Sequence, residues 1–367
     1  MENMGLNRHF WKGKRVLVTG HTGFKGSWLS FWLNDMGVRL KGIALPPASK
    51  PNLYSVLSLN NIMESKFGDI RDKEFVSREI SVFDPDIIIH MAAQAIVRTS
   101  YHDPLATFET NVLGTANILN TARKLENLKA VVSVTSDKCY ENREWDWKYR
   151  EMDAMGGFDP YSASKGCAEL VTSSFRRSFF QNDSTNKNQT GVASVRAGNV
   201  IGGGDWSDDR LIPDCIRFIF EQEELNIRNP HAIRPWQNIL DLLRGYMILT
   251  EKLYFDPERY SGPWNFGPSD DDEKPVGEIL EIMAGYAGDS FKWNYDESDN
   301  PHEASYLKLD SSKARKKLGW RTFLPLKNSL EQLMNWYSEY YEGKDMTSYT
   351  RDVIREFENL QTCTEVI

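Results

Sequence analysis

A tyrosine and a lysine spaced four residues apart, Tyr161 and Lys165, form a pair that can move a proton. Residues four apart lie on the same face of a helix, so we expect the two side chains to point the same way. A free phenol titrates near pH ~10, which is too high for a general base at neutral pH. A nearby lysine ammonium favours the phenolate and lowers that pKa. We therefore interpret the pair as catalytic, in preference to a surface tyrosine beside a solvated lysine.

Three consecutive polar residues, Ser136, Asp137 and Lys138, follow the apolar run of residues 130–134. They offer a hydroxyl, a carboxyl and an amine at the end of a predicted strand. Open α/β sheets bind their ligands at the carboxyl ends of their strands. Serine and aspartate also favour turns and helix caps, but a position opposite the tyrosine–lysine pair favours a role in a site.

A glycine-rich segment, residues 20–26 with the sequence GHTGFKG, follows a predicted strand and opens a predicted helix. In such a segment Gly20 allows a tight turn, Gly23 lets the backbone approach a pyrophosphate, and Gly26 allows close packing of the helix. The free N–H groups of the helix N-terminus attract the anion. The pattern predicts a dinucleotide site, and an oxidised nicotinamide bound there would also favour the phenolate of Tyr161.

One part of the dinucleotide pattern is missing. An acidic residue that binds the ribose hydroxyls is expected after the second strand, and residues 41–50, KGIALPPASK, contain none. The motif alone therefore leaves the choice between NAD and NADP open.

These motifs stand at the ends of apolar runs that alternate with helical patterns, as in a parallel sheet with both faces covered. The helix after the glycine-rich segment is expected to end at Gly37, and residues 107–125 show the apolar spacing of another helix. The alternation predicts a Rossmann-type, doubly wound α/β fold. The expected strands are residues 15–20, 38–45, 84–93, 130–136 and 191–200.

The periodicity weakens after residue 198, where we expect a second lobe. Residues 1–198 are predicted to form the cofactor-binding Rossmann domain, with a returning segment near 234–265. Residues 199–367 are predicted to form mainly a smaller α/β domain for the substrate. Domains usually run to roughly 100–200 residues, which suits a chain of 367 residues.

Composition and charge exclude several classes of protein. Lys and Arg number 44 against 52 Asp and Glu, a net charge of −8, whereas a nucleic-acid binder normally has a basic face. No stretch reaches the roughly 18–20 apolar residues of a membrane span, and the N-terminus lacks the pattern of a signal peptide. The four cysteines match neither a metal motif nor a disulfide framework. We therefore expect a cytoplasmic protein that uses no metal and binds neither nucleic acid nor membrane.

Taken together, the motifs resemble the extended short-chain dehydrogenase/reductase superfamily and, within it, the nucleotide-sugar 4,6-dehydratases. The resemblance covers most of the chain and is strongest to the members that act on CDP-D-glucose. The segments that carry this closer resemblance are GHTGFKGSWL (20–29), TSDKCYEN (135–142) and GGGDWSDDRLIPD (202–214). Other matching segments are GDIRD (68–72), HMAAQ (90–94), YSASK (161–165), RAGNVIGGGD (196–205) and IRPWQNILD (233–241).

The resemblance implies NAD as the cofactor, held by the glycine-rich segment and by residues that follow neighbouring strands. Asp69 and Ile70 stand where the family contacts adenine. The cofactor-binding residues that the resemblance implies are Gly20, Thr22, Gly23, Phe24, Lys25, Gly26, Asp69, Ile70, Ala92, Ala93, Gln94, Asn111, Tyr161 and Lys165.

For the chemistry, the resemblance implies oxidation at sugar carbon 4, loss of water across carbons 5 and 6, and return of the hydride to carbon 6. Tyr161 would take the proton of the 4-hydroxyl, Ser136 would hold that oxygen, and Lys165 would bind the nicotinamide ribose and tune Tyr161. Asp137 would protonate the departing 6-hydroxyl, so we expect a raised pKa when substrate excludes water. The resemblance also implies a role in bacterial deoxysugar biosynthesis, such as that of lipopolysaccharide O-antigen.

Lys138 departs from the pattern of the dTDP-glucose 4,6-dehydratases, which carry glutamate there as the base at carbon 5. A lysine could take the proton as a neutral amine. It could also stabilise the enolate as a cation while another group takes the proton. The sequence leaves both roles open.

The pyrophosphate of a sugar nucleotide needs cations, and Arg210 and Arg234 are the candidates. Asn199 stands where the family donates to the phosphate, and Asp205 and Trp206 are expected to shape the cytosine pocket. The resemblance also implies a homodimer or homotetramer.

Two other functions compete with this interpretation. An NAD-dependent nucleotide-sugar 4-epimerase shares the fold and the tyrosine–lysine pair but needs no acid at carbon 6. Asp137 and Lys138 therefore argue against it. A catalytically silent dinucleotide sensor would commonly have lost Tyr161 or Lys165, and both are present.

Overall fold

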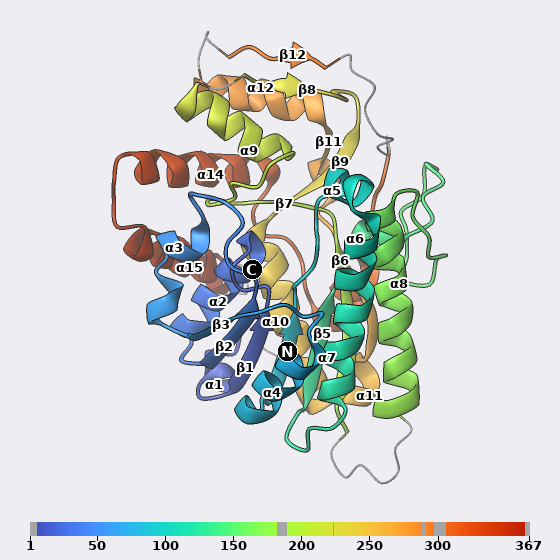
Figure 1. Ribbon diagram of the computed structural model, residues 1–367. Helices are drawn as coiled ribbons and strands as arrows, with labels where there is room; N and C mark the ends of the chain where they lie inside the picture. Colours follow the sequence, from blue (N-terminus) through green and yellow to red (C-terminus); the bar gives the residue numbers. More distant parts are fainter. Residues whose placement is uncertain (1–5, 182–188, 223, 288–290, 297–305, 364–367) are drawn as a thin grey trace.

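A parallel sheet of seven strands forms the centre of the protein (Figure 1). The computed structural model describes residues 6–181, 189–222, 224–287, 291–296 and 306–363. The sheet confirms the predicted doubly wound α/β fold. Its strands, in spatial order, are β10 (Gly262–Phe266), β6 (Gly191–Ala197), β5 (Ala130–Val134), β4 (Ile87–His90), β1 (Arg15–Thr19), β2 (Arg39–Ala44) and β3 (Glu64–Phe67).

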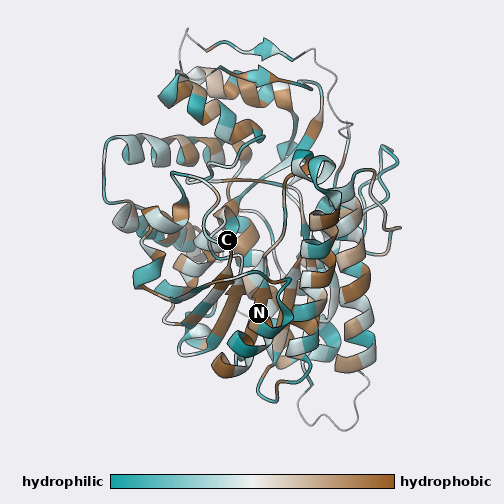
Figure 2. Cartoon of the chain, in the orientation of Figure 1, coloured by the Kyte–Doolittle hydropathy of each residue, from teal (hydrophilic) through white to brown (hydrophobic). Residues whose placement is uncertain are grey.

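The strands bury side chains in two hydrophobic layers, because successive residues of a strand point to opposite faces. In β1, Val16 and Val18 pack in the layer that contains α2 (Phe24–Asp35) and α10 (Ile239–Phe255). Leu17 packs in the opposite layer, with α4 (Lys73–Phe83) and α7 (Gly114–Ala122). Figure 2 shows hydrophobic residues gathered on the central strands and on the helices beside them. Because all seven strands run parallel, their carboxyl ends lie at one edge of the sheet, where the predicted motifs also lie.

The remaining helices and helical turns connect these layers or cover them. None of the described helices has both the length and the apolar character needed to cross a bilayer. They are α1 (Arg8–Trp11), α3 (Leu53–Val56), η1 (Leu59–Asn61), α5 (Val97–His102), α6 (Pro104–Phe108), η2 (Glu109–Leu113), η3 (Asp137–Cys139), α8 (Pro160–Phe175), η4 (Arg176–Phe180), α9 (Leu211–Ile216), η5 (Arg217–Glu221), α11 (Pro257–Tyr260), η6 (Asp270–Asp272), α12 (Val276–Ala287), α13 (Ser312–Leu318), α14 (Leu326–Tyr341) and α15 (Met346–Cys363).

The predicted helix over residues 107–125 is observed as a helical stretch of residues 104–122, which begins and ends three residues earlier and has an irregular centre. Helices α6 and α7 are joined by the π-helical turn η2, and α7 ends at Ala122. Single π turns inside helices often occur at functional sites. The turn contains Asn111, whose buried side chain bonds to residues outside this helix.

Two small sheets lie beyond the carboxyl edge of the main sheet (Figure 1). The first contains β7 (Asn199–Ile201), β9 (Ile233–Asn238) and β11 (Glu273–Pro275), and the second pairs β8 (Asn226–Ile227) with β12 (Asn294–Tyr295). Strand β9 leads directly into α10, which packs against the main sheet. The proposed domain boundary between residues 198 and 199 stays a prediction.

Candidate active site

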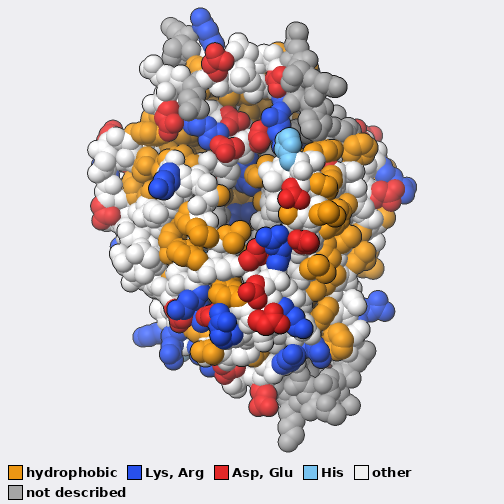
Figure 3. Space-filling model, viewed as in Figure 1, with side chains coloured by type: hydrophobic (Ala, Val, Ile, Leu, Met, Phe, Trp, Pro, Cys, Tyr) orange, Lys and Arg blue, Asp and Glu red, His pale blue; other side chains and the backbone are white. Residues whose placement is uncertain are grey.

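A cavity of about 280 Å³ opens at the carboxyl edge of the main sheet, below the small sheets. Figure 3 shows the molecule hollowed near the middle of one face, with Lys or Arg side chains in the depth. The structure brings many of the predicted site residues into the wall of this cavity. They are Phe24, Lys25, Ser136, Asp137, Lys138, Tyr161, Asn199, Asp205, Arg210 and Arg234.

Ser136 and Asp137 are held in a short helical turn directly after β5. The Ser136 hydroxyl accepts a hydrogen bond from the Lys138 backbone N–H at 3.2 Å and donates to Asp137 Oδ1 at 3.0 Å. Burial raises the pKa of Asp137, against the charges of Lys138 and Arg234 and the hydrogen bond from Ser136. A carboxyl with a raised pKa is suited to donate a proton.

Helix α8 brings Tyr161 to the cavity in its first turn. The carboxylate of Asp159 caps the helix by accepting from the Ser162 backbone N–H at 2.9 Å and from the Ser162 hydroxyl at 2.6 Å. Pro160, at the first helical position, suits a helix start because its backbone donates no hydrogen bond. Lys165, one turn later, is buried and directs its Nζ to the backbone carbonyl of Val134 at 3.5 Å.

Burial displaces the pKa values of both members of this pair. It raises the pKa of Tyr161 to about 12, although a hydrogen bond with Ser136 and the charge of Arg210 lower it. Burial, together with the neighbouring charge of Lys25, lowers the pKa of Lys165 to about 7. Ser136 and Arg210 therefore lower the pKa of Tyr161, which is the effect that we expected from Lys165. The tuning of Tyr161 by Lys165 stays a prediction.

The glycine-rich segment forms the predicted turn between β1 and α2. Gly20 has a φ of +77°, and a Cβ there would stand 2.7 Å from the Ala92 backbone nitrogen, so the turn requires glycine. A Cβ on Gly26 would collide with the Gly20 carbonyl. By contrast, a Cβ on Gly23, the N-cap of α2, would meet only the Gly20 carbonyl, at 3.5 Å. The segment packs tightly on the protein side and leaves an open side at the helix N-terminus, which fits a dinucleotide pyrophosphate.

The predicted adenine contacts follow β3, on the same edge of the sheet. Asp69 accepts hydrogen bonds from Arg71 through its backbone N–H at 2.8 Å and through its guanidinium at 2.7 and 2.9 Å. These hydrogen bonds lower the pKa of Asp69. Ile70 is buried, and its side chain fills the space beside Gly114 on α7. No acid occurs between β2 and β3, as the sequence shows, and Asp69 is the first carboxylate that follows β3.

Asn111 connects the segment after β4 to the helix that carries Tyr161. Its side chain accepts from the Gln94 backbone N–H at 2.9 Å and donates to the Gln94 carbonyl at 3.0 Å. It also donates to the Ser164 hydroxyl at 2.8 Å. The positions of Ala92, Ala93 and Gln94 after β4 place them on the same edge as the glycine-rich segment. Asn111 therefore fixes the segment after β4 relative to α8.

The predicted substrate residues divide into two groups. Arg210 donates to Asp205 at 3.3 Å, and both line the cavity, as do Asn199 of β7 and Arg234 of β9. The structure does not bring Trp206 to the cavity wall: its ring packs on aromatic residues of α14, with ring centroids 5.8 Å from Trp336, 5.7 Å from Tyr337 and 5.1 Å from Tyr340.

Sequence reasoning missed two further arginines of the cavity wall, Arg98 and Arg228. Arg98 of α5 pairs with Asp209 at 3.1 Å, which joins two sides of the cavity separated by 111 residues. Neither arginine stands in a recognisable pattern. Only the folded arrangement identifies them as cations that an anionic ligand would meet.

The chain matches the family model described as GDP-mannose 4,6 dehydratase over residues 17–333. It is 50% identical over 357 residues to a CDP-glucose 4,6-dehydratase of Salmonella typhimurium, covering 97% of this chain and 99% of that protein. A UDP-glucose 4-epimerase of Thermotoga maritima, solved with UDP-glucose, has a similar fold, with a TM-score of 0.78, 20% identity, and coverage of 89% of this chain and 99% of that one.

A dTDP-glucose 4,6-dehydratase of Streptomyces venezuelae, solved with NAD and TYD bound, also shares the fold. Its TM-score is 0.74 at 24% identity, and the match covers 89% of this chain and 97% of that chain. These two structures support the fold alone, while the family model and the Salmonella relative cover the glycine-rich segment, the Ser136–Lys138 turn and the tyrosine–lysine pair. The chain belongs to the GDP-mannose 4,6 dehydratase family, within the short-chain dehydrogenase/reductase superfamily that its motifs predict.

Proposed function

We propose that the protein is a hydro-lyase that removes water from CDP-D-glucose with NAD as its cofactor, giving CDP-4-keto-6-deoxy-D-glucose. The similarity to the Salmonella enzyme over nearly the whole chain supports this substrate. The observation that carries the reaction is the convergence of an acid, a phenol and an amine on one cavity with cationic walls. The residues are Asp137, Tyr161 and Lys138, with Arg210 and Arg234 in the same wall.

Tyr161 takes the proton of the sugar 4-hydroxyl in this proposal, while Ser136, which hydrogen-bonds with Tyr161, holds the same oxygen. NAD bound there would supply the hydride chemistry, as acceptor from carbon 4 and as donor to carbon 6. The glycine-rich segment and Asp69 would hold the dinucleotide, and Lys165 would hold the nicotinamide ribose. Burial raises the pKa of Tyr161, and the positive charge of an oxidised nicotinamide held there would lower it.

Elimination of water requires an acid at carbon 6 and removal of a proton at carbon 5. We assign the acid to Asp137, because burial raises its pKa and favours the protonated form. Lys138 lines the same cavity next to it and is assigned to carbon 5, as base or as the cation beside the enolate.

The substrate is tested by incubating the purified protein and NAD separately with CDP-glucose, dTDP-glucose, UDP-glucose and GDP-mannose. We expect CDP-glucose to give a product lighter by one water that absorbs in alkali as a 4-keto-6-deoxy sugar. Water loss from another nucleotide sugar in its place would contradict the substrate. A change of configuration at carbon 4 without loss of water would replace the dehydratase by the 4-epimerase.

The same proposal includes a homo-oligomer formed through α6, η2 and α8. These elements contact one another and expose large apolar side chains, and hydrophobic groups gather over this side of the molecule in Figure 3. The exposed side chains are Leu105 of α6, Leu113 of η2 and Leu170 of α8, with Phe158 just before α8. A cytoplasmic location agrees with the free thiols of Cys139, Cys167 and Cys215.

A further inference from the structure

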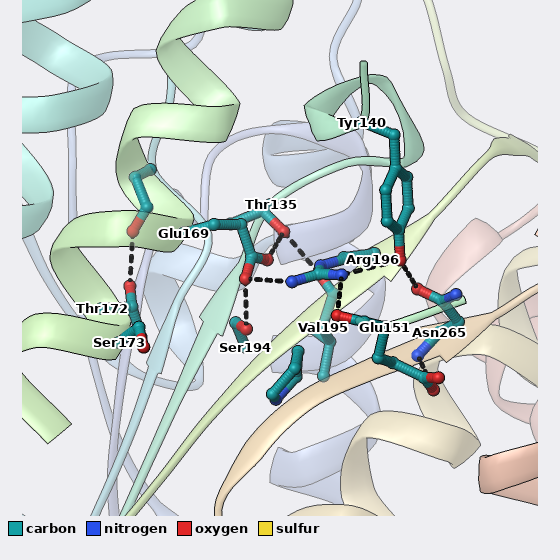
Figure 4. Close-up of polar contacts among 12 residues, drawn as sticks. Thr135, Tyr140, Glu151, Glu169, Thr172, Ser173, Ser194, Val195, Arg196 and Asn265 are labelled. Atoms are coloured by element: carbon teal, nitrogen blue, oxygen red, sulfur yellow. Dashed lines mark hydrogen bonds and ion pairs between the residues drawn. The ribbon is translucent and has the colours of Figure 1, made fainter. Parts of the chain in front are cut away.

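A buried ion pair lies behind the cavity, between Arg196 of β6 and Glu169 of α8 (Figure 4). Arg196 is 2% exposed and Glu169 is 4% exposed, and their Nη2 and Oε2 atoms are 2.8 Å apart. Neither residue lines the cavity. Burying two charges carries a desolvation cost that good geometry and further hydrogen bonds must offset, so their other contacts indicate what the pair does.

Glu169 bonds to Thr135, which leads into the turn that carries Ser136, Asp137 and Lys138, here called the catalytic turn. Its Oε1 accepts from the Thr135 hydroxyl at 2.5 Å, and its Oε2 accepts from the Ser194 hydroxyl at 2.7 Å as well as from Arg196. Burial raises the pKa of Glu169, but the charge of Arg196 and these hydrogen bonds bring it below its ordinary value. Glu169 is therefore an ionised carboxylate whose two oxygens are both engaged (Figure 4).

Arg196 bonds to the chain on the other side of the same turn. Its Nη1 donates to the Tyr140 hydroxyl at 2.7 Å and to the Glu151 carbonyl at 3.1 Å. The Tyr140 hydroxyl in turn donates to Asn265 Oδ1 at 2.7 Å. The guanidinium also lies 4.9 Å from the centre of the Tyr140 ring.

Thr135 and Tyr140 therefore anchor the two ends of the segment that carries Ser136, Asp137 and Lys138. Glu169 lies one helical turn beyond Lys165 and two beyond Tyr161, on the same face of α8. We propose that Glu169 and Arg196 are positioning residues: their ion pair joins the catalytic turn to α8 and fixes the distance between the acid side and the phenol side of the cavity. The inference rests on the proposed dehydratase function.

Glu169 also contributes to the charge around Lys165. The titratable groups that face Lys165 are Lys25 of α2, His90 of β4, Cys139 of η3 and Glu169 of α8. Burial and the charge of Lys25 lower the pKa of Lys165 to about 7, whereas Cys139 and, to a smaller extent, Glu169 raise it. Removing the carboxylate therefore moves the pKa of Lys165 downward, and the ammonium is lost at a lower pH.

The test compares Glu169→Gln, which removes the charge, with Glu169→Asp, which keeps it. In Glu169→Gln we expect kcat for CDP-glucose to fall by about 10²-fold, as for misplaced catalytic groups, with KM nearly unchanged. We also expect the alkaline limb of the kcat profile to move to lower pH. Glu169→Asp should return that limb toward its original pH. Glu79→Gln is the control, because it removes a carboxylate from a partly buried ion pair, that with Lys41, on α4 away from the cavity.

The proposal is overturned if folded Glu169→Gln keeps the kcat and the pH profile of the unchanged protein, or if Glu79→Gln reproduces its effects. Circular dichroism and the thermal midpoint of each variant establish folding. If Glu169→Gln does not fold, Arg196→Lys serves as the test. Lysine keeps the positive charge but loses the simultaneous contacts to Glu169 and Tyr140, so an unchanged kcat would contradict the proposal. Inactivity of the unchanged protein toward CDP-glucose would instead overturn the proposed function, which separates the two failures.

Discussion

At the scale of single residues, burial rather than composition distinguishes the two neighbouring groups of the catalytic turn. Asp137 and Lys138 are adjacent in the chain, yet Asp137 is 5% exposed and has a raised pKa. The sequence could place both at the end of a strand. It could not show that the Ser136 hydroxyl would join Asp137 to Tyr161, because that contact needs α8 to pack against the end of β5.

Asp137→Asn tests the acid directly. The amide keeps the size of the side chain but cannot donate the proton, so we expect kcat to fall by about 10²–10⁴-fold, the usual contribution of general acid catalysis. Activity that needs the protonated carboxyl declines as the pH rises through its pKa, and this contribution to the alkaline limb should vanish in the variant, while the contribution of Lys165 remains. A pH–rate profile unchanged by the substitution would contradict the assignment.

Lys138→Met tests the group assigned to carbon 5. We expect the variant to lose exchange of the carbon 5 proton with deuterated solvent, because neither a base nor an enolate-stabilising cation remains there. Oxidation at carbon 4, followed as NADH absorbance, should persist. Retained exchange at carbon 5 would show that Lys138 serves neither role.

At the scale of elements, the sequence predicted the features that depend on residues close together in the chain. The glycine turn at Gly20, the helical spacing of Tyr161 and Lys165 and the alternation of strands and helices were all recognisable. The π turn at residues 109–113 was not, because Asn111 bonds to Gln94 and Ser164, which only the fold brings near. The same holds for Trp206, whose environment is the distant helix α14.

The cap of α8 gives a prediction at this scale. Asp159→Ala removes two hydrogen bonds to Ser162 at the first turn of the helix that carries Tyr161. We expect a loss of about 1–2 kcal/mol in the free energy of unfolding, the larger part of the range for N-caps, because the site is buried. Urea unfolding followed by circular dichroism measures it, and Asp159→Asn, which can still accept from the backbone, should recover part of the loss. Equal stability of Asp159→Ala and the unchanged protein would contradict the capping role.

At the scale of the whole molecule, the exposed apolar side chains on α6, η2 and α8 predict an interface between copies. Leu170→Glu places a charge in this surface, and we expect it to shift the molar mass measured by light scattering toward the monomer. Val82→Glu is the control, because Val82 is also exposed but lies on α4. A mass unaffected by Leu170→Glu, or equally lowered by Val82→Glu, would place the interface elsewhere.

The most direct test of the central claim follows one hydrogen atom through the reaction. CDP-glucose carrying deuterium at carbon 4 is incubated with the protein and NAD, and the product is examined by mass spectrometry and NMR. Oxidation and return of hydride within one cavity predict a 4-keto-6-deoxy product that carries the deuterium at carbon 6. Recovery of the label at carbon 4 of a sugar that has lost no water would contradict the account.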